Sequence, residues 1–476
     1  MKKIIVIYDD SRKPNQEIKN ITGKKSFGNT IFKRISLKKR MEALLLKEPV
    51  VLRFLEEEAL KGQKELTGSD VKQVVFRLFS DFGIASKSSL GILLDKACYV
   101  NKNYRVVCDG RTAAVIYTDY GQYLAAQDEQ TAESFEKIET DVFVDLSNVS
   151  HFRQFITSGF DARFFNALSG DNYTVVKRSN NAEKLCAEYE FYALLPDEMK
   201  MWFVMPFDFK EEDKIASYTM QRYHMTDLAI RYVHGAITEE EFGDILEKLF
   251  HFIRTRKQKQ VLAEEYEQAA EALYIGKVER RLQRLKELPQ FDSIEALLKA
   301  GTNYNGIDAV FEAYKQIYGE ITAGRHFQTV LVVGHGDLCF SNILYGREAS
   351  LLKLIDPKGA TDEASLYMNP YYDLAKLSHS ICGSYDYFNS GLFEIELDEH
   401  MRFRLTVDCD NEHYIRIFKE YLKNNGLDYR LIRLYEASLF LSMLPLHIDR
   451  EKKVFAFLLN ALNILEELGE NECLKE

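Results

Sequence analysis

The chain has 476 residues, 46% of them hydrophobic and 12% aromatic, and a formal net charge of -11. One hydrophobic core rarely serves a chain of this length, so the composition predicts a globular protein of two or three domains. The acidic charge argues against a general nucleic-acid binder, which needs a basic face. It leaves room for a nucleotide held by one lysine and a metal ion.

The cysteines and the apolar runs predict a cytoplasmic protein. The 7 cysteines are scattered, odd in number and never in a C-x-x-C pair, so neither a zinc site nor a disulfide framework is expected. The apolar run near the start, KIIVIY, ends at Asp9 and Asp10, which is too short for a signal peptide. No stretch approaches the roughly 18 apolar residues of a membrane span. Nothing in the sequence indicates an oligomeric state.

The first 145 residues are expected to form a small α/β domain. Buried strands are indicated by short apolar, β-branched runs, and a helix by a stretch rich in Leu, Glu, Lys and Arg. The predicted elements are a strand at 3–8, a helix at 38–64, and two strands at 104–107 and 113–118 around the turn Asp109-Gly110.

The rest of the chain predicts a strand-rich lobe at 146–224 and a helical lobe with a helical insertion at 225–476. In the first lobe we expect strands at 161–168 and 173–178 around a turn at 169–172, a helix at 183–195, and strands at 200–206 and 216–223. In the second we expect helices over most of 225–320, hairpins within 330–355 and at 393–408, and helices over 413–470. The predicted fold class is α+β.

The residues that carry chemistry lie in two neighbouring stretches, HGDLCFSN at 335–342 and LLKLIDP at 351–357. Phosphoryl transfer from ATP requires a carboxylate that orients the acceptor hydroxyl and takes its proton, and oxygen ligands for magnesium on a short loop. Asp337 and Asn342 suit the base and the first metal ligand. Asp356 suits the second, because a hairpin returns the chain to the same place.

Each of these residues alone has a plain structural explanation, such as a turn or a helix cap. His335, which we group with Asp337 as catalytic, is better placed to shape the loop by hydrogen bonding than to react. The joint pattern is more specific. H-G-D-x-x-x-x-N, then an apolar strand, then I-D-P at hairpin distance fits kinase catalytic and metal-binding loops and little else.

A kinase of this kind needs a phosphate-contacting lysine on an upstream strand and a helix whose glutamate holds it. YTVVKRS places Lys177 in a strand, and the helix EKLCAEYEFYALLP supplies Glu188, with Glu190 as the competing choice. The alternative is that Lys177 only keeps an edge strand soluble. The downstream motif favours the functional interpretation.

Two further features of a nucleotide site are weaker in this sequence. The backbone of Gln221 to Tyr223, in a connector between the lobes, is placed to hydrogen-bond an adenine edge. The alternative is a strand end followed by a helix cap at Thr226 or Asp227. The phosphate-covering loop has one candidate, Thr157-Ser158-Gly159, which is far from a full G-x-G-x-x-G.

The set of Lys177, Glu188, HGDLCFSN and LIDP resembles the aminoglycoside phosphotransferase and choline kinase superfamily, whose fold is bilobal and protein-kinase-like. NPYYDLAKLSHS at 369–380 adds to the resemblance, because such enzymes carry a D-L-A segment shortly after the metal aspartate. The resemblance implies ATP and Mg²⁺ as cofactors, and a buttressing role for Asp373 beneath the catalytic loop.

By the same resemblance Asp337 would be the base, Asn342 and Asp356 the magnesium ligands, and Lys177 the contact to the α- and β-phosphates. Segments such as FDARFFNAL, EFYALLP and LSMLPLHID are similar to bacterial kinases encoded with capsule genes. Several of those carry a nucleotidyltransferase-like domain before the kinase. Here DDSRKPNQEI follows the first strand in place of a glycine-rich loop, so we expect a degenerate domain that serves as a scaffold or platform.

The expected activity is therefore ATP-dependent phosphorylation of a hydroxyl on a small molecule, a sugar or an amino alcohol. The resemblance to the capsule-gene kinases implies surface-polysaccharide or envelope precursor metabolism. The segments 225–320 and 393–408 are expected to wall the acceptor site, where acidic residues would suit a cationic acceptor. One alternative is a protein kinase, disfavoured by H-G-D in place of H-R-D and by the lack of an A-P-E segment. The other is a nucleotide-binding regulatory pseudokinase, disfavoured because none of the expected polar groups is missing but left open by the poor glycine loop.

Overall fold

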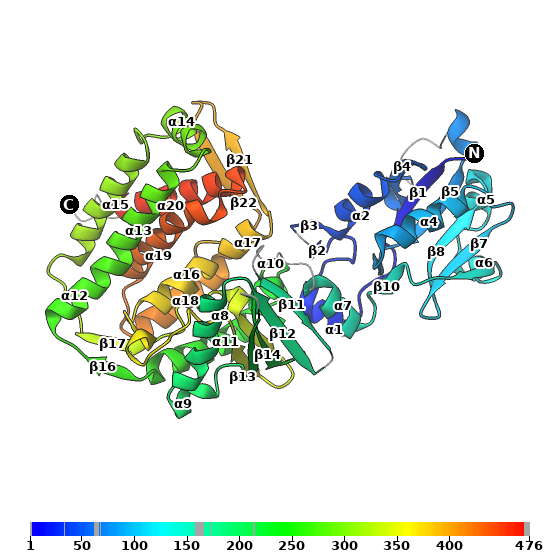
Figure 1. Ribbon diagram of the computed structural model, residues 1–476. Coiled ribbons are helices and arrows are strands. Elements are labelled where there is room, and N and C mark those ends of the chain that lie inside the picture. Colours follow the sequence, from blue (N-terminus) through cyan, green and yellow to red (C-terminus); the bar gives the residue numbers. More distant parts are fainter. Residues whose placement is uncertain are drawn as a thin grey trace. The chain divides into compact units, whose positions relative to one another are not determined.

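The computed structural model describes residues 2–32, 34–60, 66, 68–157, 166–171, 173–212 and 215–470. The chain divides into two compact units. Unit 1 comprises residues 1–161 and 234–236, and unit 2 comprises residues 162–233 and 237–476 (Figure 1). Within the described ranges no helix is long and apolar enough to cross a membrane.

Unit 1 is built on a mixed six-stranded sheet in the order β4-β1-β5-β8-β7-β9. The pairs β1–β4, β1–β5 and β7–β9 are parallel, and β8 is antiparallel to both β5 and β7. Every residue of β1 is buried, as is usual for a central parallel strand. The strands are β1 (Ile4–Asp9), β4 (Val51–Glu56), β5 (Val74–Phe79), β7 (Tyr104–Cys108), β8 (Arg111–Tyr117) and β9 (Glu136–Glu139).

Short helices and two small strand pairs complete unit 1. The helices are α1 (Gln16–Thr22), α2 (Leu37–Leu45), α3 (Glu57–Leu60), η1 (Gly68–Lys72), α4 (Lys87–Ala97), α5 (Tyr120–Ala125), α6 (Glu129–Glu133) and α7 (Val149–Thr157). The small pairs are β2 (Ile31–Phe32) with β3 (Ile35–Ser36), and β6 (Phe82–Ile84) with β10 (Phe143–Asp145).

One secondary-structure prediction for unit 1, the long helix, is wrong. The helix predicted at 38–64 ends as α2 at Leu45, and Val51–Glu56 form strand β4 beside β1. The sequence VVLRFLE is rich in β-branched and aromatic residues, and its parallel pairing with β1 outweighs the helix propensity of Leu and Glu. The turn between β7 and β8 is confirmed, with φ of 51° at Asp109 and 77° at Gly110.

A buried and a partly exposed arginine pair with the carboxylates at the carboxyl ends of β1 and β5, where α/β sheets commonly bind ligands. Arg77 Nη2 lies 2.6 Å from Asp9 Oδ2. Arg111 bridges Asp81, at 2.6 Å, and Asp145. These carboxylates are therefore matched by the chain's own guanidinium groups.

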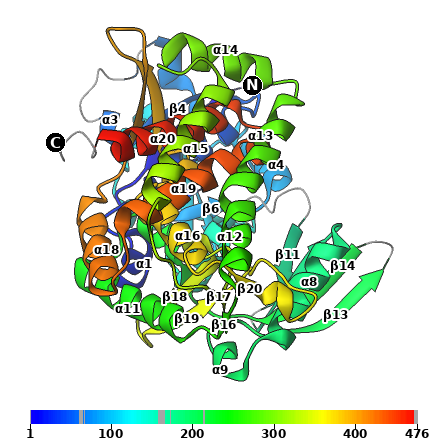
Figure 2. The same ribbon diagram turned by 90° about the vertical axis from the view of Figure 1, so that its left-hand side faces the viewer.

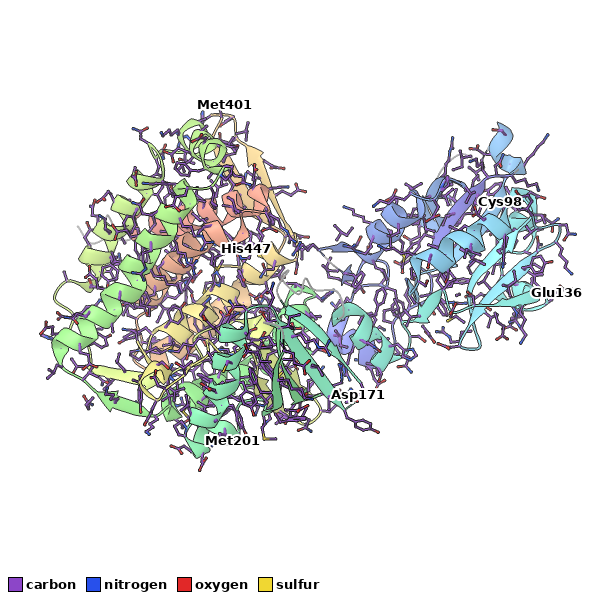
Figure 3. All side chains as sticks on the ribbon, in the orientation of Figure 1. Cys98, Glu136, Asp171, Met201, Met401 and His447 are labelled. Carbon is purple, nitrogen blue, oxygen red and sulfur yellow. The ribbon has the colours of Figure 1, made fainter. Side chains whose placement is uncertain are left out.

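Unit 2 begins with a four-stranded antiparallel sheet in the order β11-β12-β14-β13. Its strands are β11 (Asn166–Gly170), β12 (Thr174–Ser179), β13 (Pro206–Glu212) and β14 (Ile215–Gln221), and Asp171 lies at the turn between the first two (Figure 3). Helix α8 (Ala182–Leu194) packs on this sheet through Leu185, against Ala216 and Tyr218 of β14.

The strand expected at 200–206 is wrong, because β13 starts only at Pro206. A short helix, α9 (Asp197–Lys200), stands before it, and residues 202–204 run beside strand β19 instead. Val204 N donates to Leu354 O at 3.1 Å, and Leu354 N donates to Trp202 O at 2.7 Å. Pairing with a distant strand is not visible in local sequence periodicity.

The remainder of unit 2 is mainly helical. Helices α13, α15, α19 and α20 lie side by side in both views (Figure 1, Figure 2). The helices are α10 (Leu228–Val233), α11 (Glu239–Thr255), α12 (Ala263–Glu271), η2 (Ala272–Gly276), α13 (Lys277–Lys286), α14 (Phe291–Gly301), α15 (Ile307–Thr322), η3 (Phe340–Asn342), η4 (Ala364–Leu366), α16 (Tyr372–Ile381), α17 (Tyr385–Asn389), α18 (Glu412–Asn424), α19 (Tyr429–Met443), η5 (Leu444–His447) and α20 (Glu451–Glu470). A sheet-containing part followed by a helical part confirms the α+β fold class.

Short strands cross the helical part of unit 2. They are β15 (Thr226–Asp227), β16 (Gln258–Gln260), β17 (Val330–Val333), β18 (Ile343–Gly346), β19 (Leu351–Leu354), β20 (Tyr367–Met368), β21 (Phe393–Leu397) and β22 (Phe403–Val407). The hairpins β18–β19 and β21–β22 confirm the two that were expected. The second, with Met401 in its turn (Figure 3), packs Phe403 edge-on against Phe455 of α20.

Besides the small cluster beneath α8, two large hydrophobic cores lie in the described part of unit 2. One lies among the long helices and includes Tyr274, Tyr314 and Tyr435. The other includes Phe191 of α8 and Phe340 of η3, together with residues of α11, β18, β19, α16 and α18. This second core therefore joins the first helix of the sheet part to the loop at 335–342.

We expect Arg77→Met to lower the local stability of unit 1 by about 3–5 kcal/mol, because it leaves buried carboxylates without a cation. Hydrogen exchange of β1 and β5 peptides, read by mass spectrometry, measures this for unit 1 alone. Arg53→Met is the control, since Arg53 is 55% exposed in its pair with Asp70. It should cost less than about 1 kcal/mol. Equal losses from the two changes would contradict the prediction.

Candidate active site

The hairpin β18–β19 brings the two predicted motif stretches together. Its register pairs Ile343 with Leu354, so the residues just outside the hairpin on either strand are neighbours. Ile355 N donates to Asn342 O at 3.0 Å. The loop 335–342 and Asp356 therefore meet at the open end of the hairpin, as the spacing in the sequence predicts.

His335 shapes the loop from inside. Its Nδ1 accepts a hydrogen bond from Asp337 N at 3.1 Å, so its Nε2 carries the proton and donates to Ile355 O at 2.9 Å. The ring is fully buried and stacks on the ring of Phe203, with 5.8 Å between the two ring centres. Burial lowers the pKa of His335, which keeps the imidazole neutral. Both ring nitrogens thus make the hydrogen bonds that fix the turn.

Asp373, at the start of α16, accepts backbone hydrogen bonds from the same turn of the loop 335–342. Its Oδ2 accepts from His335 N at 3.0 Å and its Oδ1 from Gly336 N at 2.8 Å. Arg256 supplies the counter-charge, with Nη1 at 2.9 Å from Asp373 Oδ2, and its Nη2 donates to Pro370 O at 3.0 Å. Both side chains are almost completely buried, so the loop rests on an internal ion pair.

Gly336 is required by its backbone and by the space around it. Its φ is 78°, in the left-handed region that favours glycine, and a Cβ there would lie 2.6 Å from Cβ of Lys358. Lys358 N also donates to His335 O at 2.9 Å, which fixes the close approach. The arginine that protein kinases carry in H-R-D does not fit this loop.

Asp337 lies at the tip of the loop with its side chain 43% exposed. Its Oδ1 is 2.8 Å from Lys376 Nζ. Asn342 Nδ2 donates to the backbone oxygen of Asp337 at 2.9 Å and to its Oδ2 at 3.2 Å. Burial alone would raise the pKa of Asp337, but the Lys376 ammonium outweighs it and lowers the pKa to about 2. The carboxylate is therefore ionised at neutral pH.

Lys177 connects the sheet part of unit 2 to the hairpin. Its Nζ lies 2.6 Å from Glu188 Oε2 on α8 and 2.9 Å from Asp356 Oδ1. Burial disfavours the ammonium, but Asp356 and Glu188 outweigh this and raise the pKa of Lys177. Of the two candidate glutamates, Glu188 and not Glu190 is therefore the partner of Lys177. Tyr218 also donates to Glu188 Oε2, at 3.4 Å.

The segment after Asp356 is tied to α8 by its backbone. Ala360 N donates to Ala187 O at 2.9 Å. Gly359 has a φ of 85°, and a Cβ there would meet the Ala187 Cβ at 3.0 Å. This hydrogen bond and the close approach at Gly359 fix the separation between helix α8, which carries Glu188, and the loop that carries Asp356.

The predicted adenine-binding residues lie where β14 passes into the connector that follows it. Gln221 is the last residue of β14 and is exposed. Tyr223 is half-buried, with Lys353 Nζ 5.6 Å from the centre of its ring. The connector then enters β15, which pairs with β18. The adenine contact stays a prediction, and Ser158 and Gly159 of the predicted phosphate loop lie outside the described residues.

Sequence reasoning missed two charged residues that hold the site, Arg256 and Lys376. Arg256 is 117 residues from Asp373 in the sequence and stands in the charged stretch RTRKQK, so nothing local marks it. Lys376 did leave a signal. It follows Asp373 by three residues in YDLAK, so the two side chains share one face of a helix.

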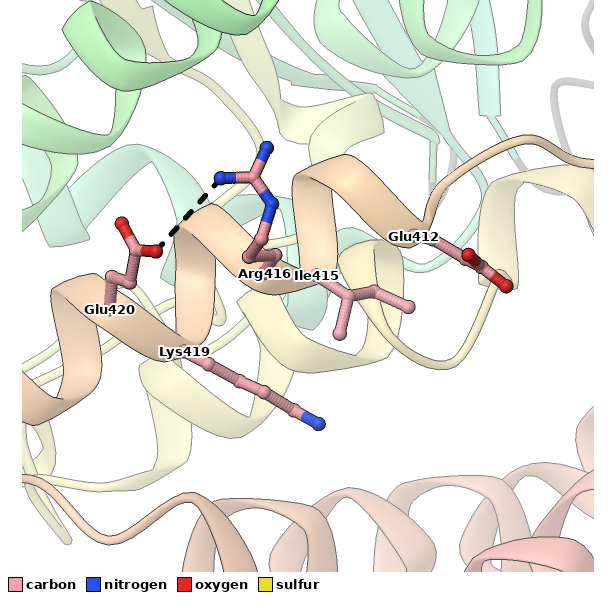
Figure 4. Close-up of a pocket in the computed structure, with 5 residues that line it drawn as sticks. All are labelled: Glu412, Ile415, Arg416, Lys419 and Glu420. Carbon is pink, nitrogen blue, oxygen red and sulfur yellow. Dashed lines mark ion pairs between the residues drawn. The ribbon is translucent and has the colours of Figure 1, made fainter.

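A hollow of about 410 Å³ on α18 is unrelated to these residues (Figure 4). It is lined by one helix face, namely Glu412, Ile415, Arg416, Lys419 and Glu420. Arg416 pairs with Glu420 at 3.9 Å across it. None of the predicted site residues borders this hollow.

No protein-family model and no curated protein sequence matches the chain. Solved structures that are similar include a thermostable mutant of aminoglycoside phosphotransferase APH(4)-Ia in a ternary complex with AMP-PNP and hygromycin B. That match has 11% identity and a TM-score of 0.40, over 63% of this chain and 93% of the other.

Two further similar structures are also small-molecule kinases by their names. A putative fructosamine-3-kinase from Haemophilus somnus 129PT has 11% identity and a TM-score of 0.36, over 61% of this chain and 83% of the other. An aminoglycoside-3'-phosphotransferase of type VIII has 14% identity and a TM-score of 0.34, over 56% and 84%. The function proposed below rests on the geometry of this chain's own residues.

We expect the pair Arg256–Asp373 to show strong coupling in a double-mutant cycle. Asp373→Leu should cost about 3–5 kcal/mol, because Arg256 is left buried without a counter-ion. Arg256→Met should cost less, about 1–3 kcal/mol, since Asp373 keeps two backbone donors. The combined variant should cost less than the sum of both.

Trp202 is the chain's one tryptophan and adjoins the hairpin, so urea denaturation followed by its fluorescence reports on unit 2. Arg254→Met is the control, because Arg254 is 46% exposed in its pair with Glu247. Additive losses at Arg256 and Asp373 would mean that the ion pair does not support the loop.

Proposed function

We propose that the protein is an ATP- and magnesium-dependent phosphotransferase that acts on a hydroxyl group of a small molecule. The observation that carries this proposal is the chain of contacts that links four residues, Lys177, Asp356, Asn342 and Asp337. Lys177 reaches Asp356 from the sheet part at 2.9 Å, and Asp356 adjoins a loop in which Asp337 and Asn342 are held side by side.

The residues present fit a magnesium ion. Asn342 directs its Nδ2 at Asp337, so its amide oxygen points the other way, and Asp356 has a side chain that is 42% exposed. Carboxylate and amide oxygens are the ligands that magnesium prefers in proteins. When bound between these residues and the phosphates, magnesium would neutralise charge on the transferring group.

Each of the other residues has a defined part in this mechanism. Asp337, ionised and partly exposed, orients the acceptor hydroxyl and takes its proton as the new O–P bond forms. Lys177, held by Glu188, contacts the α- and β-phosphates. His335 and Asp373 keep the loop rigid, and rigid placement of the base is where much of the rate acceleration arises.

The acceptor is proposed to be a sugar or an amino alcohol, in surface-polysaccharide or envelope precursor metabolism in the cytoplasm. Gly336 disfavours a protein kinase, since its space excludes the usual arginine. Unit 1 is proposed to serve as a scaffold or platform, because its sheet ends are closed by arginine–carboxylate pairs.

We expect Asp337→Asn to lower kcat by about 10²–10⁴-fold, because the proton acceptor is lost. The measurement is ADP release with Mg-ATP and a panel of sugars, amino alcohols and aminoglycosides. Asp362→Asn is the control, since Asp362 is an exposed carboxylate further along the same chain segment. Full turnover by Asp337→Asn would show that the base is assigned wrongly. Binding of Mg-ATP by the wild type without turnover on any acceptor would favour the pseudokinase.

We expect Lys177→Met and Asp356→Ala each to weaken Mg-ATP binding by at least about tenfold, because each removes a charged contact to the phosphates or the metal. Isothermal titration with and without Mg²⁺ measures this, and the Asp356→Ala titration should lose its magnesium dependence. Lys184→Met is a matched control, since Lys184 also contacts Glu188, at 3.4 Å, but is 56% exposed. An equal effect of Lys184→Met would argue against a phosphate contact at Lys177.

A further inference from the structure

Lys376 lies one helical turn after Asp373 on α16 and faces the catalytic loop. Its Nζ is 2.8 Å from Asp337 Oδ1, and its side chain is only 12% exposed. Asp373 accepts hydrogen bonds from the two residues just before Asp337. One turn of α16 thus engages three consecutive loop residues, two through their backbone and the third through its side chain.

The Lys376–Asp337 pair is not needed to hold the loop in shape. Asp373, His335 and Asn342 already bond the loop backbone, at distances of 2.8–3.1 Å. An ion pair in which one partner is 43% exposed contributes little net stability, because solvent screens the attraction and the desolvation of the lysine offsets it. The place of this lysine is therefore better explained by what it does when substrates bind.

Phosphoryl transfer needs positive charge at the transferring group, since negative charge spreads over its three equatorial oxygens. The loop HGDLCFSN contains neither lysine nor arginine. Lys177 approaches from the other side, where it is bound to Glu188 and Asp356. On the side of the base, Lys376 is the cation in contact with Asp337.

The distances place Lys376 within reach of the reacting atoms. A base must lie within hydrogen-bond reach of the acceptor hydroxyl, about 2.6–3.2 Å, and the hydroxyl oxygen must approach phosphorus to about 3–3.5 Å. The Lys376 ammonium is already 2.8 Å from the base. A small rotation of its flexible four-carbon stem moves it toward an equatorial phosphoryl oxygen.

We propose that Lys376 is a catalytic cation that binds the γ-phosphoryl group during transfer, and that Asp337 holds it in place until the substrates arrive. This inference rests on the proposed function and adds a residue to its site. In the step itself the acceptor O–H bond breaks and its proton goes to Asp337, while the acceptor oxygen forms a bond to phosphorus. The bond from phosphorus to the bridging oxygen breaks, and its electron pair stays on ADP.

The change in the negative charge of Asp337 explains why Lys376 can move from Asp337 to the phosphoryl group. As Asp337 takes the proton, it loses the negative charge that held the ammonium. The γ-phosphoryl oxygens carry negative charge before and during the transfer, so Lys376 keeps an anionic partner when its pair with Asp337 is lost. Lys376 itself transfers no proton.

The first test compares nucleotides that differ in the γ-group, so it needs no acceptor. Lys376→Met is expected to weaken binding of Mg-AMP-PNP by about tenfold or more and to leave Mg-ADP within about twofold. Lys376→Arg keeps the charge and should retain the preference for Mg-AMP-PNP within about threefold. Lys277→Met is the matched control, because Lys277 donates to Tyr372 on the same helix at 2.8 Å and does not contact the loop. It should change neither affinity.

The second test is turnover of the full chain on the acceptor found by the panel. Lys376→Met should lower kcat by about 10²–10³-fold, the usual loss for one preorganised donor, and should raise the KM for ATP in line with the weaker binding of Mg-AMP-PNP. Trp202 fluorescence checks folding, and Lys376→Gln carries the same comparison if the methionine variant does not fold. Equal weakening of both nucleotides, or a wild-type kcat, would overturn the role of Lys376. A wild type that binds neither nucleotide would instead overturn the proposed function itself.

Discussion

The geometry of the candidate site depends on one carboxylate, Asp373. It accepts hydrogen bonds from two successive backbone N–H groups of the loop and is itself neutralised by Arg256. Because a buried charge is stabilised best when it is fully paired, these contacts support one another. The left-handed turn at Gly336, the inward His335 and the outward Asp337 all follow from that fixed backbone.

The hairpin β18–β19 converts this local order into a site made from distant segments. It places Asp356 at the end of the loop, where Lys177 reaches it from a strand 179 residues earlier. The core that contains Phe191 and Phe340 lies beneath both parts. In the proposed mechanism the sheet part supplies charge for phosphates and the helical part supplies the base, so neither part alone holds the complete set of residues.

The sequence predicted those features that local spacing encodes. The loop, the hairpin after it, the Lys177 strand and the α8 helix all follow from short patterns, and the structure has Glu188 facing Lys177 as expected. The failures have one physical cause. β4 and the segment 202–204 are shaped by pairing with distant strands, and Arg256 is positioned by a partner far along the chain. Neither effect changes the local periodicity from which elements are predicted.

The backbone hydrogen bond from Ala360 to Ala187 has a consequence for control of the protein. An enzyme can be switched off by swinging away the helix that carries the glutamate, which breaks the lysine–glutamate pair. Here that helix is fastened to the segment after Asp356 by a bond that does not depend on side-chain identity. Moving α8 would also pull at the Asp356 loop, so we expect the two segments to move together. The Lys177–Glu188 and Lys177–Asp356 pairs are therefore linked through the backbone as well as through the lysine itself.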